Sequence, residues 1–298
     1  MANKEQLDIF NLSVEDVETH KQEDKKSDLY KPKAADGKDG TYKALIRFVP
    51  NPQNPRKSLV RKLVYWLTDM DNNGTLVDSP STVGDKCPIQ NMFFKLRKSE
   101  SAVDRKMADK LKRREQFYAI IKVLKDPQNP EMEGQYKIFK FGRKIKIKID
   151  EEMMPNFGEP TQVFDLFEGK NFELVITKQG DFNNYDTCKF SSKHSPIMIN
   201  DVEMDNTDDN RKLIKEDLDK APELAPFDYK PWDEELTSKV QNILNQYRSP
   251  GDHIGNIVNT PVTETRKPDA PKATAKVTTK AATGDSDDLD SFLNDLDI

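Results

Sequence analysis

The chain has 298 residues, of which 35% are hydrophobic and 33% are charged, and its mean hydropathy is −0.83. This low apolar share indicates polar, disordered segments beside one or two domains of ordinary core composition. No apolar run approaches the roughly 18 residues that a membrane span needs, and the N-terminus lacks a signal-peptide pattern. The two cysteines, Cys87 and Cys188, exclude a disulfide framework and fit a reducing compartment.

The positive and negative charges are segregated along the chain, although the net charge is only −5. Residues 41–150 contain 24 lysines and arginines against 12 acidic residues, whereas residues 284–298 contain six acidic residues and no basic one. A basic body followed by an acidic tail is typical of proteins that bind nucleic acids.

Both ends of the chain have the composition of flexible segments. Near the N-terminus, Leu7, Phe10, Val14 and Val17 have helical spacing, which predicts either a frayed helix without a role or a protein–protein contact element. Residues 20–40 are charged and contain glycine, so we expect a flexible arm there. Residues 249–283 are rich in proline, threonine, alanine and lysine, which predicts a disordered linker.

Between these ends, the apolar patterns predict a folded core over residues 41–248. Four-residue spacing predicts helices over residues 100–116 and 232–248, and the stretch at 79–96 is expected to be a loop that enters a short helix. Residues 144–149 alternate lysine with isoleucine, which predicts either a strand with a basic face or an edge strand guarded by lysines. The other expected strands are residues 42–51, 58–69, 117–125, 136–141 and 172–178, with a turn at 71–74.

Residues 105–149 combine lysines and arginines with aromatic residues. Basic side chains neutralise phosphates, and flat rings offer unpaired bases a stacking surface, which is what single-stranded nucleic acid binding requires. The same pattern also fits aromatic residues packed in a core beneath a solvated basic face, and these residues alone do not decide between the two. The aromatic residues are Phe117, Tyr118, Tyr136, Phe139 and Phe141, and a polar loop at 180–190 adds Phe182, Tyr185 and Phe190.

The C-terminal residues 284–298 carry regularly spaced apolar side chains within an acidic run. Such a tail can mimic a nucleic-acid backbone and compete for a basic groove, or it can fold on a partner protein as an amphipathic helix. A solubilising tail is the third alternative. The residues expected to bind a partner are Asp287, Asp288, Leu289, Phe292, Leu293 and Leu296.

The sequence contains no recognisable catalytic motif, because it lacks a glycine-rich nucleotide loop, GxSxG and HExxH. We therefore expect no enzymatic activity. His20, His194 and His253 are scattered and are interpreted as surface residues. The segment from Cys87 to Gln90 resembles half of a zinc knuckle in which glutamine replaces the second cysteine, and one thiol cannot supply the four ligands of structural zinc.

Six motifs occur in the order ALIRFVP, STVGDKCP, KRREQFYAIIKVLKDPQNPEMEG, IFKFGRKI, GEPTQVFDLFEGKNFELVI and DFNNYDTCKF. Together they resemble the single-stranded DNA-binding proteins (helix-destabilising proteins) of T-even-like bacteriophages. The similarity covers about residues 42–190, and the ending LDSFLNDLDI separately resembles the acidic C-terminus of that family.

The resemblance implies a mainly β fold with helical additions (α+β). It would have an OB-fold core at residues 41–248, a flexible N-terminal arm at 1–40 that is a candidate for self-association, a linker at 249–283 and a disordered acidic C-terminal tail at 284–298. It also implies a cleft that binds single-stranded DNA without sequence preference. The DNA-binding residues expected on this basis are Arg47, Lys112, Arg113, Arg114, Phe117, Tyr118, Phe139, Lys140, Arg143, Lys144, Phe182 and Tyr185.

The chain departs from the family pattern at three places. The family's zinc site uses one histidine and three cysteines, and these positions fall here on Trp66, Ser79, Cys87 and Gln90. Because only Cys87 is retained, we expect the protein to bind no metal and no other cofactor. We also expect a small apolar cluster around Trp66 to take over the structural role of the zinc. The N-terminus MANKEQLDIF lacks the family's basic motif for contacts between neighbouring subunits, and the family pattern at 144–149 is closer to a helix than to a strand.

The expected function is to coat and protect single-stranded DNA during viral DNA replication, recombination and repair, in the cytoplasm of the infected bacterial host cell. The acidic tail would recruit replication and recombination proteins. Contacts between copies of the chain along DNA are also expected, but the sequence does not indicate which residues make them. One alternative is an RNA-binding regulatory protein that uses the same basic and aromatic groove. Another is an interaction scaffold whose basic face meets an acidic protein.

Overall fold

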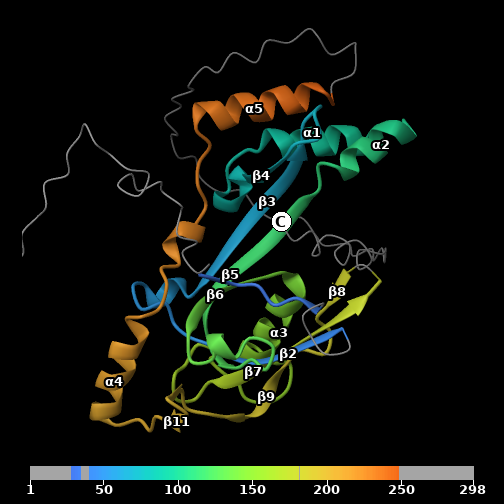
Figure 1. Ribbon diagram of the computed structural model, residues 1–298. Coiled ribbons are helices and arrows are strands. Elements are labelled where there is room, and N and C mark those ends of the chain that lie inside the picture. Colours follow the sequence, from blue (N-terminus) through green and yellow to red (C-terminus); the bar gives the residue numbers. More distant parts are fainter. Residues whose placement is uncertain (1–27, 35–39, 181, 248–298) are drawn as a thin grey trace, which may run out of the picture. The chain divides into compact units, whose positions relative to one another are not determined.

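The computed structural model describes residues 28–34, 40–180 and 182–247, which divide into two compact units (Figure 1). Unit 1 comprises the described residues up to Val60 together with Phe117–Gln179 and Asn183–Phe227. Unit 2 comprises Arg61–Gln116, Gly180–Phe182 and the described residues from Asp228 onward. The described chain has five α-helices and a large sheet, so the expected mixture of strands with helical additions is confirmed.

Several predictions concern residues that are not described. The amphipathic pattern from Leu7 to Val17, the linker at 249–283 and the tail at 284–298 all lie outside the described residues. The partner-binding role of the tail therefore stays a prediction, and it concerns Asp287, Asp288, Leu289, Phe292, Leu293 and Leu296.

The sheet of unit 1 is built from β1 (Leu29–Tyr30), β2 (Thr41–Phe48), β5 (Arg113–Lys125), β6 (Tyr136–Phe141), β7 (Lys170–Gln179), β8 (Phe182–Asn184) and β9 (Lys189–His194). The first four residues of β5 and Phe182 of β8 belong to unit 2. Its order is β1-β6-β5-β2-β7-β8, with β9 also paired to β7. The β5–β6, β5–β2, β2–β7 and β7–β9 pairs are antiparallel, whereas β1 runs parallel to β6. The four strands expected within residues 42–51, 117–125, 136–141 and 172–178 are confirmed.

Strand β5 is buried on both of its faces. Successive side chains of a strand point to opposite faces, and here Ala119 and Ile121 enter one core cluster while Tyr118 and Ile120 enter another. The first cluster also receives Phe48 and Phe172. A strand covered on both sides has an almost continuous apolar sequence, and this explains the run FYAIIKVL.

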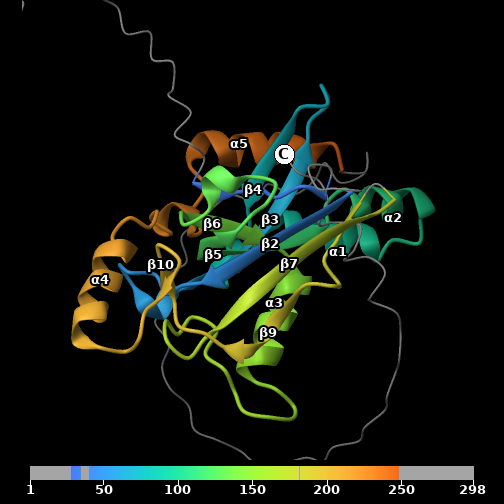
Figure 2. The same cartoon turned by 60° about the horizontal axis from the view of Figure 1, so that its bottom comes forward.

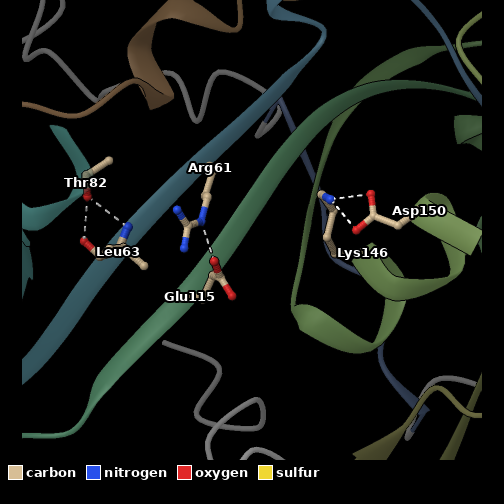
Figure 3. A network of polar contacts seen from close by, with 6 residues as sticks. All are labelled: Arg61, Leu63, Thr82, Glu115, Lys146 and Asp150. Atoms are coloured by element: carbon tan, nitrogen blue, oxygen red, sulfur yellow. Dashed lines mark hydrogen bonds and ion pairs between the residues drawn. The ribbon is translucent and has the colours of Figure 1, made fainter. Parts of the chain in front are cut away.

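Residues 144–149 do not form a strand. They belong to helix α3 (Arg143–Met153), which lies against β9 (Figure 2). Ile145 and Ile149 are four residues apart and both enter the core, while Ile147 is 43% exposed. Lys146 pairs with Asp150 at 2.5 Å, the i,i+4 spacing of a helix (Figure 3). The strand prediction is wrong because an alternating run also places every second apolar residue at helical i,i+4 spacing.

Residues 28–34 are packed, although the sequence assigned them to a flexible arm. Tyr30 and Ala34 are buried in the core of unit 1. The hydroxyls of Tyr30 and Tyr42 donate to the same Asp126 carboxylate oxygen at 2.7 and 2.5 Å. Because the Asp126 side chain is fully buried, these hydrogen bonds compensate for its lost hydration and tie β1 to the sheet.

The C-terminal part of unit 1 covers the second core cluster. It contains the short strands β10 (Met198–Ile199) and β11 (Val202–Glu203), helix α4 (Asp208–Leu218) and the 3-10 turn η5 (Ala225–Phe227). Ile214 and Leu218 of α4 enter that cluster. Asp217 of the same helix lies 2.5 Å from the ammonium group of Lys122 on β5, and both side chains are almost fully buried.

Unit 2 contains the hairpin of β3 (Leu59–Thr68) and β4 (Gly74–Asp78), the 3-10 turn η3 (Pro80–Val83) and the helices α1 (Pro88–Arg97), α2 (Ala102–Asp109) and α5 (Glu234–Asn245). The first two residues of β3 belong to unit 1. The expected turn at 71–74 and the helix within 232–248 are confirmed, and Asp233 caps α5 by accepting from the Leu236 N–H at 2.7 Å. The helix expected over 100–116 ends at Asp109 instead, because the chain enters β5 at Arg113.

Polar contacts join the elements of unit 2. The Thr82 hydroxyl of η3 accepts from the Leu63 N–H at 3.0 Å, and Arg61 on β3 pairs with Glu115 on β5 (Figure 3). The Trp232 indole N–H donates to the Asp78 carbonyl at 2.6 Å and so attaches the segment before α5 to β4. No helix in the described part of the chain is long and apolar enough to cross a membrane.

Candidate nucleic-acid interface

Three of the aromatic side chains expected to stack on bases lie inside unit 1. Phe117, Tyr118 and Phe139 are 3%, 6% and 2% exposed. The Phe117 ring stacks on Phe141 with centroids 5.9 Å apart, and the Tyr118 ring packs on Phe227 at 4.9 Å. Protein covers these three rings, two on β5 and one on β6, and this fits the core alternative. Base stacking by them stays a prediction.

Arg47 of β2 is also fully buried. Its guanidinium donates to the Asp165 carbonyl at 2.6 Å and to the Asn171 side-chain oxygen at 3.4 Å. Gly169 leaves the space for this group, since a side chain there would come within 2.5 Å of a guanidinium nitrogen. Burial lowers the pKa of Arg47 to about 10. These contacts hold the turn before β7 in place, and a phosphate contact of Arg47 stays a prediction.

The loop at 180–190 places its rings less deeply. Phe182, at the start of β8, and Tyr185, just after it, are both half-buried. Tyr185 packs partly against the first core cluster of unit 1, and its carbonyl accepts from the Cys188 N–H at 3.1 Å. Each of the two side chains keeps part of its surface exposed. Among the aromatic residues expected to bind DNA, Phe182 and Tyr185 are therefore the accessible candidates for base stacking.

Lys144 of α3 is paired with a carboxylate. Its ammonium nitrogen lies 3.0 Å from Asp186 Oδ1, and the neighbouring Lys148 donates to the Asp186 carbonyl at 3.0 Å. The hydrogen bond from Lys144 holds the pKa of Asp186 below its ordinary value. Asp186 directly follows Tyr185, so the two lysines attach the turn that carries this ring to α3.

The basic residues Lys140 and Arg143 flank the junction between β6 and α3. Lys140 is half-buried near the end of β6, and Arg143 is exposed at the first position of α3. Gly142 separates the strand from the helix. Of the expected DNA-binding residues in unit 1, solvent therefore reaches Lys140, Arg143, Lys144 and Tyr185.

In unit 2, the consecutive residues Lys112, Arg113 and Arg114 differ in their surroundings. Lys112 lies 3.1 Å from Asp109 and its side chain is 20% exposed. Arg113 is exposed, and its guanidinium is 3.4 Å from the Gln90 side-chain oxygen. Arg114 is half-buried, and burial lowers its pKa. Of the three, Arg113 is the most accessible to a phosphate.

Phe94 on α1 is an exposed aromatic residue outside the set expected from the sequence. This ring is 48% exposed, lies edge-on to Phe93 with centroids 5.4 Å apart, and stands next to the exposed residues Lys95 and Arg97. Ile89 and Leu96 form the buried side of α1. Because their spacing leaves position 94 off that side, the helical pattern contained a signal that could have identified this exposed ring.

Comparison with known proteins identifies the family of the chain. A family model described as "gp32 DNA binding protein like" matches residues 39–247. The chain belongs to this family. The single-stranded DNA-binding proteins of Enterobacteria phages T2 and T4 are each 30% identical to it over 217 residues, which is 69% of this chain and 67% of the relative.

Apart from residues 28–34, the family match includes the described residues of both units, and with them every expected DNA-binding residue from Arg47 to Tyr185. It ends before the acidic tail at 284–298. Because the gp32-like family consists of DNA-binding proteins, the expectation that the chain is not an enzyme is confirmed by family membership. The resemblance found in the sequence is confirmed as well.

The four positions at which the resemblance implies zinc ligands do not fit a zinc site. Trp66 and Gln90 have no side chain that binds zinc, and Ser79 offers a hydroxyl where a thiolate is needed. Cys87 is buried, and its thiol donates to the Tyr65 hydroxyl at 3.8 Å. No cluster of three or more histidine, cysteine, aspartate or glutamate side chains suited to a metal occurs in the described ranges.

Proposed function

We propose that this chain binds single-stranded DNA without sequence preference and coats it during viral DNA replication, recombination and repair. The observation that carries the proposal is the match of the gp32-like family to residues 39–247, which include most of both folded units. The excess of basic residues between positions 41 and 150 supports it independently. The place of action would be the cytoplasm of the infected host cell.

The chemistry would rest on two kinds of contact. Exposed cations such as Arg113 and Arg143 would neutralise phosphates and release counterions, which makes affinity fall with salt concentration. The half-exposed rings of Phe182 and Tyr185 would stack on unpaired bases, each contributing about 1–3 kcal/mol. Affinity for duplex would be lower, because paired bases are already stacked on one another.

We also propose that the sheet of unit 1 is an OB-fold core. The antiparallel strands β6, β5, β2 and β7 stand side by side, and a small curved antiparallel barrel is the usual framework for binding oligonucleotides. Residues 1–40 would then contribute self-association along DNA and residues 284–298 would recruit replication and recombination proteins. Without metal or other cofactor, the protein would depend on its side chains alone.

Titration of the full chain with labelled oligo-dT, oligo-rU and duplex DNA at 50 and 200 mM salt tests the function. We expect oligo-dT to bind most tightly, with an affinity that falls by orders of magnitude between the two salt concentrations. Equal affinity for duplex would refute the proposal, and tighter binding of oligo-rU would favour an RNA-binding regulator.

A variant ending at Thr283 should bind oligo-dT more tightly at low salt if the tail competes for the cations, and unchanged affinity would refute that competition.

Lys144 and Asp186 should act as a pair that positions Tyr185. Asp186→Asn removes a negative charge from the DNA-binding unit, yet we expect it to weaken oligo-dT binding several-fold because the turn loses its attachment to α3. Lys144→Ala should weaken binding similarly and leave the slope of log K against log salt unchanged, since no phosphate contact is lost. Fluorescence anisotropy over a series of salt concentrations measures both quantities.

The opposite result would identify Lys144 as a phosphate ligand. In that case Lys144→Ala would reduce the magnitude of the slope by about 0.7, and Asp186→Asn would tighten binding by freeing the lysine. Lys212→Ala is the matched control, because it removes another lysine of unit 1 that is paired with an aspartate, at 3.2 Å from Asp209, on the exposed surface of α4.

A further inference from the structure

Three distant segments of unit 2 meet at one buried hydroxyl group. Tyr65 on β3, Ser79 at the start of η3 and Cys87 before α1 are 1%, 0% and 2% exposed. The Cys87 thiol donates to the Tyr65 hydroxyl at 3.8 Å, and the same hydroxyl is hydrogen-bonded to Ser79. Burial raises the pKa of Tyr65, so its hydroxyl stays neutral and available as both donor and acceptor.

A second set of hydrogen bonds continues this connection. The Ser79 hydroxyl accepts from the Ser81 N–H at 3.3 Å, and the Ser79 N–H donates to the Leu63 carbonyl at 2.7 Å. The Ser81 hydroxyl donates to the Gln90 side-chain oxygen at 2.7 Å. Neutral groups therefore join β3, η3 and α1 without any charged ligand.

The position of Tyr65 corrects an expectation from the sequence. The residue expected at the centre of this region was Trp66, within an apolar cluster. Neighbouring residues of a strand point to opposite faces, and Trp66 instead lies against Gly74, where an added side chain would come within 1.9 Å of its ring. Tyr65 is the β3 residue that reaches Cys87 and Ser79.

From these contacts we propose that the hydrogen-bonded cluster of Tyr65, Ser79 and Cys87 holds unit 2 together in place of a metal. A structural zinc joins separate chain segments through four cysteine or histidine ligands and contributes directly to folding. Here one tyrosine hydroxyl joins the same kind of segments, and the thiol of Cys87 is a hydrogen-bond donor to it. The fold of unit 2 is thus independent of metal, and this inference does not depend on the proposed DNA-binding function.

The two tryptophans of the chain, Trp66 and Trp232, both belong to unit 2, so tryptophan fluorescence reports its unfolding. In the full chain, Tyr65→Phe removes the shared hydroxyl, so the buried Cys87 thiol and Ser79 hydroxyl lose a hydrogen-bond partner. We expect its fluorescence-detected melting temperature to fall by about 4–8 °C, the shift that loss of about one hydrogen bond causes in a domain of this size. Tyr229→Phe, which removes a hydroxyl from a half-buried residue of unit 2, is the control and should change it little.

Metal content supplies an independent measurement on the wild-type protein. We expect elemental analysis to find no stoichiometric zinc after purification without chelators, and EDTA or phenanthroline to leave the melting temperature unchanged. Stoichiometric zinc, or a lower melting temperature with chelator, would overturn the inference, as would a Tyr65→Phe variant that melts like the wild type. If that variant fails to fold, the wild-type metal analysis and chelator titration still decide.

Discussion

Replacing Lys122 with methionine should lower the free energy of unfolding of unit 1 by about 3 kcal/mol, because it removes the buried cation beside Asp217 and leaves that carboxylate only the exposed Lys220, at 2.9 Å. The two side chains are 4% and 11% exposed, and their charged atoms lie 2.5 Å apart. The Tyr136 hydroxyl also donates to Asp217 at 2.8 Å, but a neutral hydroxyl does not replace the lost charge. Chemical denaturation followed by circular dichroism measures the difference.

Two further variants show whether the effect comes from loss of the buried cation beside Asp217. The double variant Lys122→Met/Asp217→Leu should recover much of the lost stability, since replacing a whole buried ion pair by apolar groups is often close to neutral. Lys212→Met on the exposed face of α4 should change stability by less than about 0.5 kcal/mol. A Lys122→Met protein as stable as the wild type would show that the pair does not hold α4 to the sheet.

Asp217 should also make stability depend on pH. Burial by itself raises the pKa of this carboxyl, but hydrogen bonds from Lys122, Lys220 and Tyr136 outweigh burial and lower the pKa below its ordinary value of 3.8. A carboxyl with a lowered folded-state pKa contributes stability that is fully present above its unfolded-state value and is lost as pH falls through the folded-state value. As pH falls below about 4, the free energy of unfolding should therefore decrease less in the Asp217→Asn variant than in the wild type. The variant should be less stable than the wild type at neutral pH.

Replacing Lys112, Arg113 and Arg114 together with alanine should weaken oligo-dT binding by about 10²–10³-fold at 50 mM salt. This estimate assumes three phosphate contacts, each of which contributes about 0.7 to the slope of log K against log salt and about tenfold to the affinity at that salt concentration. The magnitude of the slope should fall by about 2. Arg113→Ala alone, which removes the exposed member and leaves the half-buried Arg114 in place, should give about one third of the change in slope.

The matched control removes three cations from α4, in Arg211→Ala/Lys212→Ala/Lys215→Ala. All three residues are exposed, so the net charge changes by the same amount as in the triple variant of unit 2. If the control loses as much affinity, net charge and not local contact governs binding. If the triple variant of unit 2 keeps the wild-type slope, these residues do not contact phosphates.

Local patterns were sufficient to locate most elements of the fold. The strands β5 and β6 follow from β-branched and aromatic residues bounded by the turn at DPQNPEMEG, and α5 follows from its apolar spacing and the Asp233 cap. The pattern did not predict α3, because Ile145 and Ile149 fit both the two-residue alternation of a strand and the i,i+4 spacing of a helix. Only the packing of both residues into the core of unit 1 decided for the helix.

The sequence by itself determined the family, the segregation of charge, the absence of a zinc donor set at the expected positions and the location of most strands, because each depends on residue identity or short-range spacing. Tertiary structure alone decided which candidate residues reach solvent. Phe117 and Arg47 are buried by segments distant in the chain, Lys144 is paired by Asp186, and Lys122 by Asp217. Alternation along a strand shows which residues share a face, but what covers that face depends on contacts that no local pattern contains.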